Sequence, residues 1–346
     1  MADASRIRTA GGAVVSADVM DCTLRDGSYA VGFQFAEGDI HAVLTGLDAA
    51  GIRLVELGHG LGLGAAGALG KPMLVPEERC FELAAGLRRA AWGMFCIPGI
   101  ATLSHLRRAA AAGMRFVRVG VDITDVTPAE RFVETAKGLG LLTFANLMKT
   151  NVLDADGVGD AAQQCEKYGA DAVYLVDSAG AYLPDEVRDL VAAVGQRLDV
   201  PLGFHGHDNL GLANANALAA AAAGARYIDT TLDGIGRGAG NAVTECFAAI
   251  VRDDAAGGYD YRALAQLSET VVRPLARLHD DRVYQVMGAV TRTHSSFFPL
   301  ISGCARAAGV DAFELMAEVA DVDRIAPTEG LVREIAGRLA ARLAAR

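Results

Sequence analysis

The sequence predicts an α/β fold, a (β/α)8 barrel (TIM barrel) with a C-terminal helical extension. Three observations lead to this prediction: short apolar runs alternate eight times with longer amphipathic segments, polar residues gather at the ends of the apolar runs, and the alternation stops near residue 258. Eight parallel strands joined by helices close into such a barrel. We therefore expect a catalytic barrel at 14–257 and a helical extension at 258–346.

The apolar runs are the predicted strands. Their shortness and the turn residues that bound them favour a parallel sheet covered by helices. In chain order they occupy residues 14–24, 52–57, 91–97, 116–123, 141–147, 172–176, 200–204 and 227–232. The alternative is an open doubly wound sheet, which usually carries a glycine-rich phosphate-binding turn after its first strand. The first run ends instead in Arg25-Asp26-Gly27.

The segments between the strands have helical spacing, and several begin near a proline and end before a glycine, as helices commonly do. These predicted helices occupy residues 37–50, 76–89, 102–112, 128–139, 156–168, 184–198, 210–223 and 241–252. In the extension, helices at 261–278, 295–308, 312–318 and 330–345 follow one another without strands. They could cover the barrel mouth, form a subunit interface or dock a partner.

Composition excludes several classes of function. The net charge is −10, the chain has one tryptophan, and no basic stripe interleaves with aromatic residues, so we expect no nucleic-acid partner. No apolar run is long enough for a bilayer span or a signal peptide, so we expect no membrane contact. The six cysteines are scattered through apolar runs without a CxxC pair, which is typical of buried thiols in a reducing compartment. A cytoplasmic enzyme is the resulting expectation.

The sharpest local feature is His205-Gly206-His207 at the end of the seventh run. Residues i and i+2 of a strand face the same way, so both imidazoles can point at one ion. Asp26, at the end of the first run, would complete a face of two histidines and one carboxylate. This set leaves positions open for substrate, and its N/O ligands suit Mn²⁺, our first choice, or Mg²⁺, Co²⁺ or Zn²⁺.

Other polar residues at the strand ends are candidates for substrate contacts. Arg25 could hold a carboxylate, stabilise an enolate oxygen, or form an ion pair with Glu56 or Asp177. We expect His59 and Thr231 to face the substrate as well, although His59 could instead support a ligand. The backbone N–H groups of the glycine-rich stretch 234–240 could bind an anion, because this stretch precedes a helix.

Four motifs resemble a known superfamily. TLRDG at 23–27, VDSAG at 176–180, HGHDNLGLANAN at 205–216 and GAGNA at 238–242 are similar to the metal-dependent barrels of the pyruvate aldolases, isopropylmalate and homocitrate synthases and hydroxymethylglutaryl-CoA lyase. The resemblance spans about residues 18–250. The stretches at 55–65 and 294–298 look more like 4-hydroxy-2-oxovalerate aldolase than like the synthases.

The resemblance implies roles for individual residues. Asp26, His205 and His207 match the metal ligands, and Asn241 matches an asparagine at or near the metal in some members. Arg25 matches the residue that stabilises the pyruvate enolate, and Ser178 falls where the aldolase loop meets the keto-acid carboxylate. The implied reaction removes the proton of a 4-hydroxyl group and breaks the C3–C4 bond of a 2-keto acid.

The sequence departs from the aldolases at two positions. The aldolases carry a histidine, the expected base, where this chain has Tyr29, and a tyrosine where it has His294. The two residue types have exchanged places. Both can move protons, so our hypothesis is that His294 acts as base or proton relay, with Tyr29 as its hydrogen-bond partner.

The resemblance leaves several functions open. A divalent-metal-dependent aldolase acting on a 4-hydroxy-2-keto acid, giving pyruvate and an aldehyde, is the first. A Claisen-type condensation of an acyl-CoA with a 2-keto acid, or a lyase like hydroxymethylglutaryl-CoA lyase, is the alternative. A catalytically inactive scaffold is disfavoured by the intact Asp26, His205 and His207. The aldolases pair with an acylating aldehyde dehydrogenase, which makes such a partner an expectation here, and the apolar helical extension favours a homodimer.

Overall fold

Eight parallel strands close into a barrel in the computed structural model, which describes residues 17–251, 258–276 and 281–344. The strands are β1 (Asp18–Leu24), β2 (Leu54–Leu57), β3 (Ala91–Cys96), β4 (Phe116–Asp122), β5 (Leu142–Met148), β6 (Ala172–Asp177), β7 (Leu202–Gly206) and β8 (Tyr227–Thr230). They pair in sequence order, and β1 closes the barrel by pairing with β8, with Asp18 opposite Tyr227. The predicted fold class is confirmed, and the open-sheet alternative is wrong.

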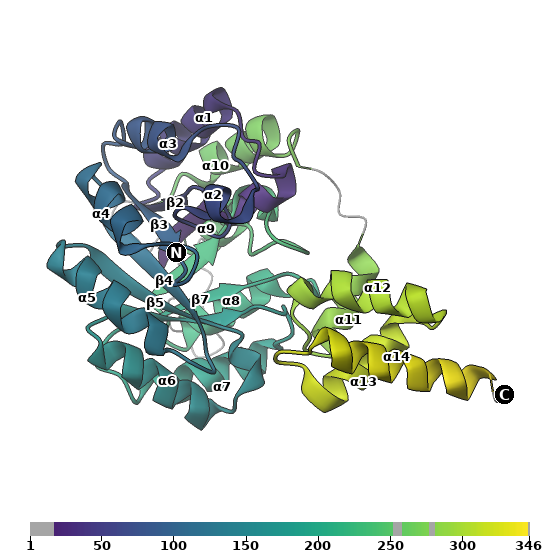
Figure 1. Cartoon of the computed structure of the whole chain (residues 1–346). Helices are drawn as coiled ribbons and strands as arrows, with labels where there is room; N and C mark the ends of the chain where they lie inside the picture. Colours follow the sequence, from purple (N-terminus) through teal and green to yellow (C-terminus); the bar gives the residue numbers. More distant parts are fainter. Residues whose placement is uncertain (1–16, 252–257, 277–280, 345–346) are drawn as a thin grey trace, which may run out of the picture.

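Helices surround the barrel, as Figure 1 shows. The barrel helices are α1 (Glu37–Ala49), α2 (Ala65–Leu69), α3 (Glu77–Ala84), α4 (Leu103–Ala111), α5 (Glu130–Gly138), α6 (Ala155–Lys167), α7 (Pro184–Gly195), α8 (Ala213–Ala222) and α9 (Thr244–Val251). Branched and aliphatic side chains fill the layer between strands and helices. Inside the barrel the aromatic rings of Phe116, Phe144, Tyr174 and Tyr227 pack on one another.

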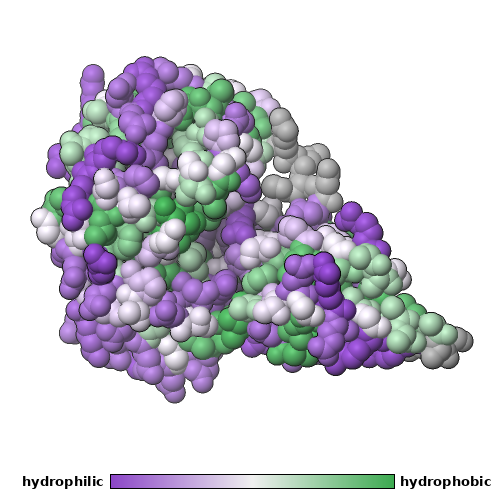
Figure 2. Space-filling model, viewed as in Figure 1, coloured by the Kyte–Doolittle hydropathy of each residue, from purple (hydrophilic) through white to green (hydrophobic). Residues whose placement is uncertain are grey.

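The helices after residue 258 fall into two groups. α10 (Tyr261–Leu267) and a π-helical turn (Ser268–Val272) return to the barrel, where Leu264 and Val272 join its core. α11 (Arg282–Val290), α12 (Phe298–Ala308), α13 (Ala312–Asp323) and α14 (Glu329–Ala344) form a separate lobe with its own core. The lobe projects from one side of the barrel (Figure 1), and apolar surface covers parts of it (Figure 2).

Most predicted elements lie within a few residues of the observed ones, and the differences have local causes. α3 ends at Ala84 rather than residue 89, because a turn through Gly86 precedes β3. α2 was not predicted, since it has five residues between Gly64 and Gly70, which both have left-handed backbones. α11 was missed as well, and α13 runs five residues further than predicted.

Three further expectations concern the domain boundary, membrane spans and the cysteines. Residues 252–257, where we expected the boundary between barrel and extension, and residues 14–16 of the first predicted strand lie outside the described residues. No helix in the described part of the chain is long and apolar enough to cross a membrane. All six cysteines are unpaired, and all except Cys246 are buried, so the expectation of buried thiols is wrong at that position.

Candidate metal centre

Three side chains from opposite ends of the barrel sequence converge at the carboxyl end of the strands. Asp26 opens a short 3-10 helix, η1 (Asp26–Val31), directly after β1. His205 lies on β7, and His207 follows that strand. One ligand atom from each of these residues lies within 4.8 Å of the other two, and all three side chains are at least nine-tenths buried. The structure thus brings together the three residues that the sequence nominated.

Hydrogen bonds leave the same ring nitrogen of each histidine available. His205 Nδ1 lies 2.9 Å from Asp229 Oδ2, and His207 Nδ1 lies 3.2 Å from the carbonyl oxygen of Gly240. A histidine that donates its Nδ1 proton to an oxygen presents Nε2 as a lone pair, the usual arrangement in metal sites. Nε2 is therefore the candidate ligand atom of both residues.

The protonation states suit a cation. Burial alone would raise the pKa of Asp26, but the charges of Arg25, His207 and His205 and a hydrogen bond from Asn241 lower it well below its ordinary value. Burial lowers the pKa of His207 to about 4, against the opposing charge of Asp26. A carboxylate beside a neutral imidazole at neutral pH is the state that binds a divalent metal without first releasing protons.

Asn241 completes this wall of the site. Its Nδ2 donates to Asp26 Oδ2 at 2.6 Å, while its buried Oδ1 has no hydrogen-bond partner. A β-carbon at Gly236 would lie 2.1 Å from Asn241 Nδ2 and 2.8 Å from Asp26 Oδ2, so this position requires glycine. An unpartnered buried oxygen next to the ligand set fits a cation, because such an oxygen is costly unless it is coordinated.

Two backbone N–H groups of the glycine-rich stretch bond within the protein. Its Arg237 N–H donates to Asp26 Oδ2 at 3.3 Å, and its Gly240 N–H donates to the Arg237 carbonyl at 3.1 Å. These two N–H groups are therefore engaged within the protein. Through the first of them the stretch contacts the Asp26 carboxylate, and Asn241 directly follows the stretch.

A chain of buried ion pairs supports the ligands from below. Arg25 donates to Glu56 Oε2 and to Asp26 Oδ1, each at 2.7 Å, so the expected ion pair with Glu56 is present. Arg118, fully buried inside the barrel, donates to Glu56 Oε2 at 2.8 Å and to Asp229, which holds His205. Buried charges persist only when they are paired in this way. The network fixes the orientation of Arg25 and His205.

A polar cavity of about 470 Å³ opens to solvent above these groups. Of the predicted site residues, Arg25, Asp26, Tyr29, Ser178, His205, His207 and His294 line it. His59 and Thr231 do not. The His59 ring is fully buried and stacks on Phe33 with ring centroids 3.9 Å apart, and the Thr231 hydroxyl is buried without a hydrogen-bond partner. The structure gives no contact between either residue and this cavity.

Tyr29 and His294 both reach the cavity, one from η1 and the other from the start of the short helix η6 (Ser295–Phe297) in the extension. The described residues show no hydrogen bond between them, so that part of the hypothesis is wrong. His294 Nδ1 lies instead 2.7 Å from Ser296 Oγ. Burial, followed by the nearby charges of Arg237 and Lys149, lowers the pKa of His294 well below its ordinary value.

Two further residues line the cavity: Asn146, which the sequence places among the polar residues at strand ends without a specific role, and Arg237, which it does not single out. Asn146, at the end of β5, has a buried Oδ1 with no partner. Arg237 extends its guanidinium over the ring of Tyr29, 5.7 Å from the ring centroid. The polar end of β5 and the single basic residue in the stretch 234–240 were the available signals.

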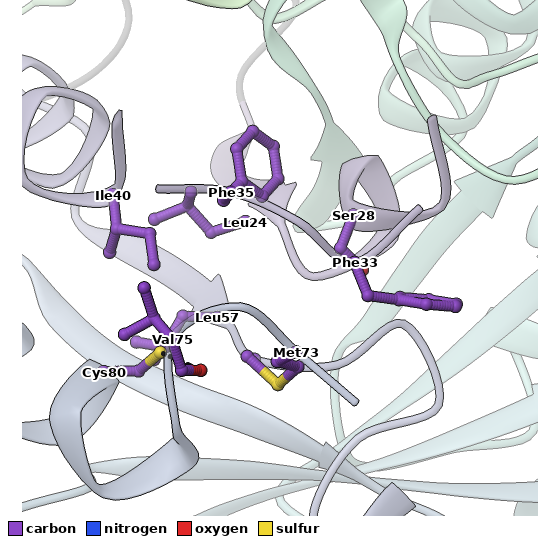
Figure 3. A pocket seen from close by; sticks show the side chains of 10 residues that line it. Leu24, Ser28, Phe33, Phe35, Ile40, Leu57, Met73, Val75 and Cys80 are labelled. Carbon is purple, nitrogen blue, oxygen red and sulfur yellow. Dashed lines mark hydrogen bonds between the residues drawn. The ribbon is translucent and has the colours of Figure 1, made fainter. Parts of the chain in front are cut away.

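A second cavity, of about 320 Å³, is lined by Ser28 of η1 and mainly by apolar side chains (Figure 3). Leu24, Ile40, Leu57, Val75 and Cys80 face one another across it, with Met73 and Phe33 near its edge. Its one hydroxyl, on Ser28, donates to the Arg25 carbonyl at 2.6 Å. A cavity without a free charged group does not suit an anionic substrate, and the polar cavity is the candidate site.

Comparisons with known proteins identify relatives of this chain. The sequence profile of the HMGL-like family matches residues 17–271. The chain is 38% identical over 330 residues to 4-hydroxy-2-oxovalerate aldolase 2 of Nocardia farcinica, covering 94% of each chain. It is 35% identical to 4-hydroxy-2-oxovalerate aldolase of Moorella thermoacetica, covering 94% of this chain and 97% of that one.

Solved structures agree on the fold. The carboxyl transferase domain of Rhizobium etli pyruvate carboxylase superimposes with a TM-score of 0.73 over 95% of this chain and 60% of that one. At 17% identity this likeness concerns the fold alone. It extends beyond the barrel into the C-terminal helices, because a match to the barrel alone would cover a smaller share of the chain.

Proposed function

The chain belongs to the HMGL-like family, and from that premise we propose that it is a divalent-metal-dependent aldolase. It cleaves or forms the C3–C4 bond of a 4-hydroxy-2-keto acid, with pyruvate as one product of cleavage. The observation that carries the proposal is the convergence of Asp26, His205 and His207 on one point beside a polar cavity. The relatives named as 4-hydroxy-2-oxovalerate aldolases support the same reaction class.

The proposed metal ligands are Asp26 and the Nε2 atoms of His205 and His207, with the free Oδ1 of Asn241 as a further candidate. A divalent cation bound there supplies Lewis-acid stabilisation of the negative charge that develops when the carbon–carbon bond breaks. Mn²⁺ is our first choice, because imidazole and oxygen ligands without thiolate suit it. Mg²⁺, Co²⁺ and Zn²⁺ are the alternatives.

Two residues bind and orient the keto acid. Arg25 uses Nε and Nη1 for Glu56 and Asp26, which leaves its Nη2 protons to donate to the keto acid or its enolate. Ser178 Oγ accepts from the Lys149 N–H at 2.9 Å, so the hydroxyl proton of Ser178 is free to donate to a carboxylate. Both residues line the same cavity.

Proton transfer falls to His294 and Tyr29. His294 Nδ1 is paired with Ser296, so Nε2 is the nitrogen that takes the proton of the 4-hydroxyl group. The lowered pKa of His294 keeps its ring neutral at neutral pH, as a base requires. Tyr29, across the cavity, holds the 4-oxygen through its hydroxyl group. An acylating aldehyde dehydrogenase partner, a homodimer and a cytoplasmic location remain predictions.

The test is a substrate panel run with Mn²⁺. Pyruvate release from 4-hydroxy-2-keto acids supports the aldolase, whereas thiol release from an acyl-CoA and a 2-keto acid would replace it with a Claisen synthase. His207→Ala should abolish pyruvate release and weaken Mn²⁺ binding measured by electron paramagnetic resonance. His41→Ala, on the exposed face of α1, is the matched control and should bind Mn²⁺ as the wild type does.

A further inference from the structure

Arg237 is a cation without a counter-ion at the mouth of the active site. Among the described residues its guanidinium has no carboxylate partner, while its backbone N–H binds Asp26. The other basic side chains nearby are all paired. Arg25 binds Glu56 and Asp26, Arg118 binds Glu56 and Asp229, and Lys149 lies 2.7 Å from Asp122.

An unpaired guanidinium next to a metal site is unfavourable unless an anion joins it. The three buried carboxylates of the site, on Asp26, Glu56 and Asp229, face the two guanidinium groups of Arg25 and Arg118. A divalent cation would turn the one net negative charge into one net positive charge, and the carboxylate of the keto acid would neutralise it. The positive charge of Arg237 is then the one without a counter-ion, and a second negative charge in the substrate would neutralise it.

The position of Arg237 indicates which end of the substrate carries that charge. Its guanidinium lies over the ring of Tyr29, and its charge lowers the pKa of His294. Tyr29 and His294 flank the 4-hydroxyl group in the proposed function. A substituent on C4 therefore points towards Arg237, away from the keto-acid end that Arg25 and Ser178 hold.

We propose that Arg237 binds a carboxylate on the aldehyde-derived half of the substrate, so that the preferred substrate is a 4-hydroxy-2-keto dicarboxylate. This inference rests on the proposed function. The base removes the 4-hydroxyl proton, the C4–O bond becomes a carbonyl, and the C3–C4 electron pair stays on C3. Protonation of C3 then gives pyruvate, and the other product is a short carbonyl compound that carries a carboxylate. No oxidant or co-reactant is needed.

A matched pair of substrates tests the inference. 4-Hydroxy-2-oxoglutarate and 4-hydroxy-2-oxovalerate have the same five-carbon chain and differ in a carboxylate or a methyl group at C5. We expect the wild type to prefer the dicarboxylate in kcat/KM by about 10-fold or more, because a charge-assisted hydrogen bond contributes about that much. Arg237→Leu should reduce this ratio about 10- to 100-fold, and Arg237→Lys should retain part of it.

Binding of substrates that cannot be cleaved gives a second readout. 2-Oxoglutarate and 2-oxovalerate lack the 4-hydroxyl group, and calorimetry with the Mn²⁺-loaded protein measures their affinities. The wild type should prefer 2-oxoglutarate, and Arg237→Leu should lose that preference. Arg333→Leu, on the exposed face of α14, is the control and should keep the wild-type ratios.

The outcomes separate the two proposals. Equal cleavage of the two substrates by the wild type, or an equal loss for both in Arg237→Leu, would overturn the role of Arg237 while leaving the aldolase intact. If neither substrate released pyruvate with any of the four metals, the proposed function itself would fail. Circular dichroism of the variant checks that it folds, and the calorimetric ratio decides the role of Arg237 if turnover is too low to measure.

Discussion

The neighbours of His294 determine its protonation state and which of its ring nitrogens is free. Burial lowers the pKa of its imidazole, and the positive charges of Arg237 and Lys149 add to this effect, because both disfavour the protonated ring. Ser296 fixes one ring nitrogen, which leaves the other facing the cavity. Tyr29 of the barrel and His294 of the extension line the same cavity.

We predict that His294→Ala lowers kcat about 100-fold or more, since general-base catalysis contributes about 10²–10⁴-fold. Tyr29→Phe should lower it less, because it removes a hydrogen bond and leaves the base in place. The pH profile is the diagnostic measurement. Because the pKa of His294 is lowered, the base of the wild type stays neutral down to pH values below the ordinary histidine range. Its kcat should therefore stay level there, and near-wild-type turnover in both variants would exclude the pair from proton transfer.

Asp21 allows a pH prediction that is independent of catalysis. Its buried carboxyl group accepts hydrogen bonds from the Thr23 N–H at 2.9 Å and the Thr244 hydroxyl at 2.7 Å, yet burial raises its pKa from 3.8 to about 6. The folded state therefore holds this proton more tightly than the unfolded state does. Its contribution to stability is present below pH 4 and is lost as the pH rises to about 6.

We predict that Asp21→Asn becomes more stable relative to the wild type as the pH rises. The amide oxygen can still accept from the Thr23 N–H, the amide NH2 group can donate to the Thr244 hydroxyl oxygen, and the side chain has no charge to bury. Between pH 4.5 and pH 7 the free energy of unfolding of the variant should rise relative to the wild type by about 2 kcal/mol, most of the energy that a pKa difference of this size represents. Urea titrations at both pH values measure it. Asp321→Asn, on an exposed face of α13, is the control, and parallel curves for Asp21→Asn would contradict the prediction.

Sequence reasoning predicted the convergence of Asp26, His205 and His207 because its signal is local, and it missed residues whose roles depend on packing. The two histidines are two residues apart at the end of one predicted strand, and strand alternation predicts that their rings face the same way. The inferred role of Arg237 rests on the lack of a carboxylate partner among the described residues. The sequence does not show where the neighbouring carboxylates lie in space. Thr231 stands at a strand end, as predicted, but its side chain is buried away from the cavity. A place at the end of a predicted strand therefore does not by itself put a side chain in the cavity.

At the scale of elements, buried charges join four strands of the barrel. Arg118 on β4 connects Glu56 on β2 to Asp229 on β8, and Asp229 holds His205 on β7. The Arg118 guanidinium also stacks on the Tyr174 ring, 4.4 Å from its centroid. Its strand reads as an apolar run, so the sequence predicted the strand and gave no reason to expect a charge network inside it.

We predict that Arg118→Met destabilises the protein by about 3–5 kcal/mol or more, because it leaves Glu56 and Asp229 buried without their cation. The control Arg333→Met breaks an exposed i,i+4 ion pair with Glu329 and should cost less than about 1 kcal/mol. Chemical denaturation compares the two variants. If Arg118→Met unfolded at the same denaturant concentration as Arg333→Met, the network would be structurally neutral.

At the scale of the whole molecule, the active site belongs to both the barrel and the lobe. The lobe has its own hydrophobic core, and polar contacts dock it on the barrel. Asn209, in the loop after β7, donates to the side-chain and backbone oxygens of Gln285 on α11 at 3.1 and 2.9 Å. Arg292 pairs with Glu186 of α7 at 2.8 Å. The sequence predicted an extension that could cover the barrel mouth, but its docking depends on these long-range contacts, which local patterns do not encode.

The docking contact therefore positions His294, and Gln285→Ala should lower kcat/KM about 10- to 100-fold by loosening α11, since a misplacement of about 1 Å can cost this much. Mn²⁺ affinity should stay within about 2-fold of wild type, because the ligands all lie on the barrel. The decisive experiment is a double-mutant cycle. If Gln285 acts through His294, then adding Gln285→Ala to His294→Ala causes no further loss of activity. Additive losses in that cycle would mean that α11 affects catalysis by a route that does not pass through His294.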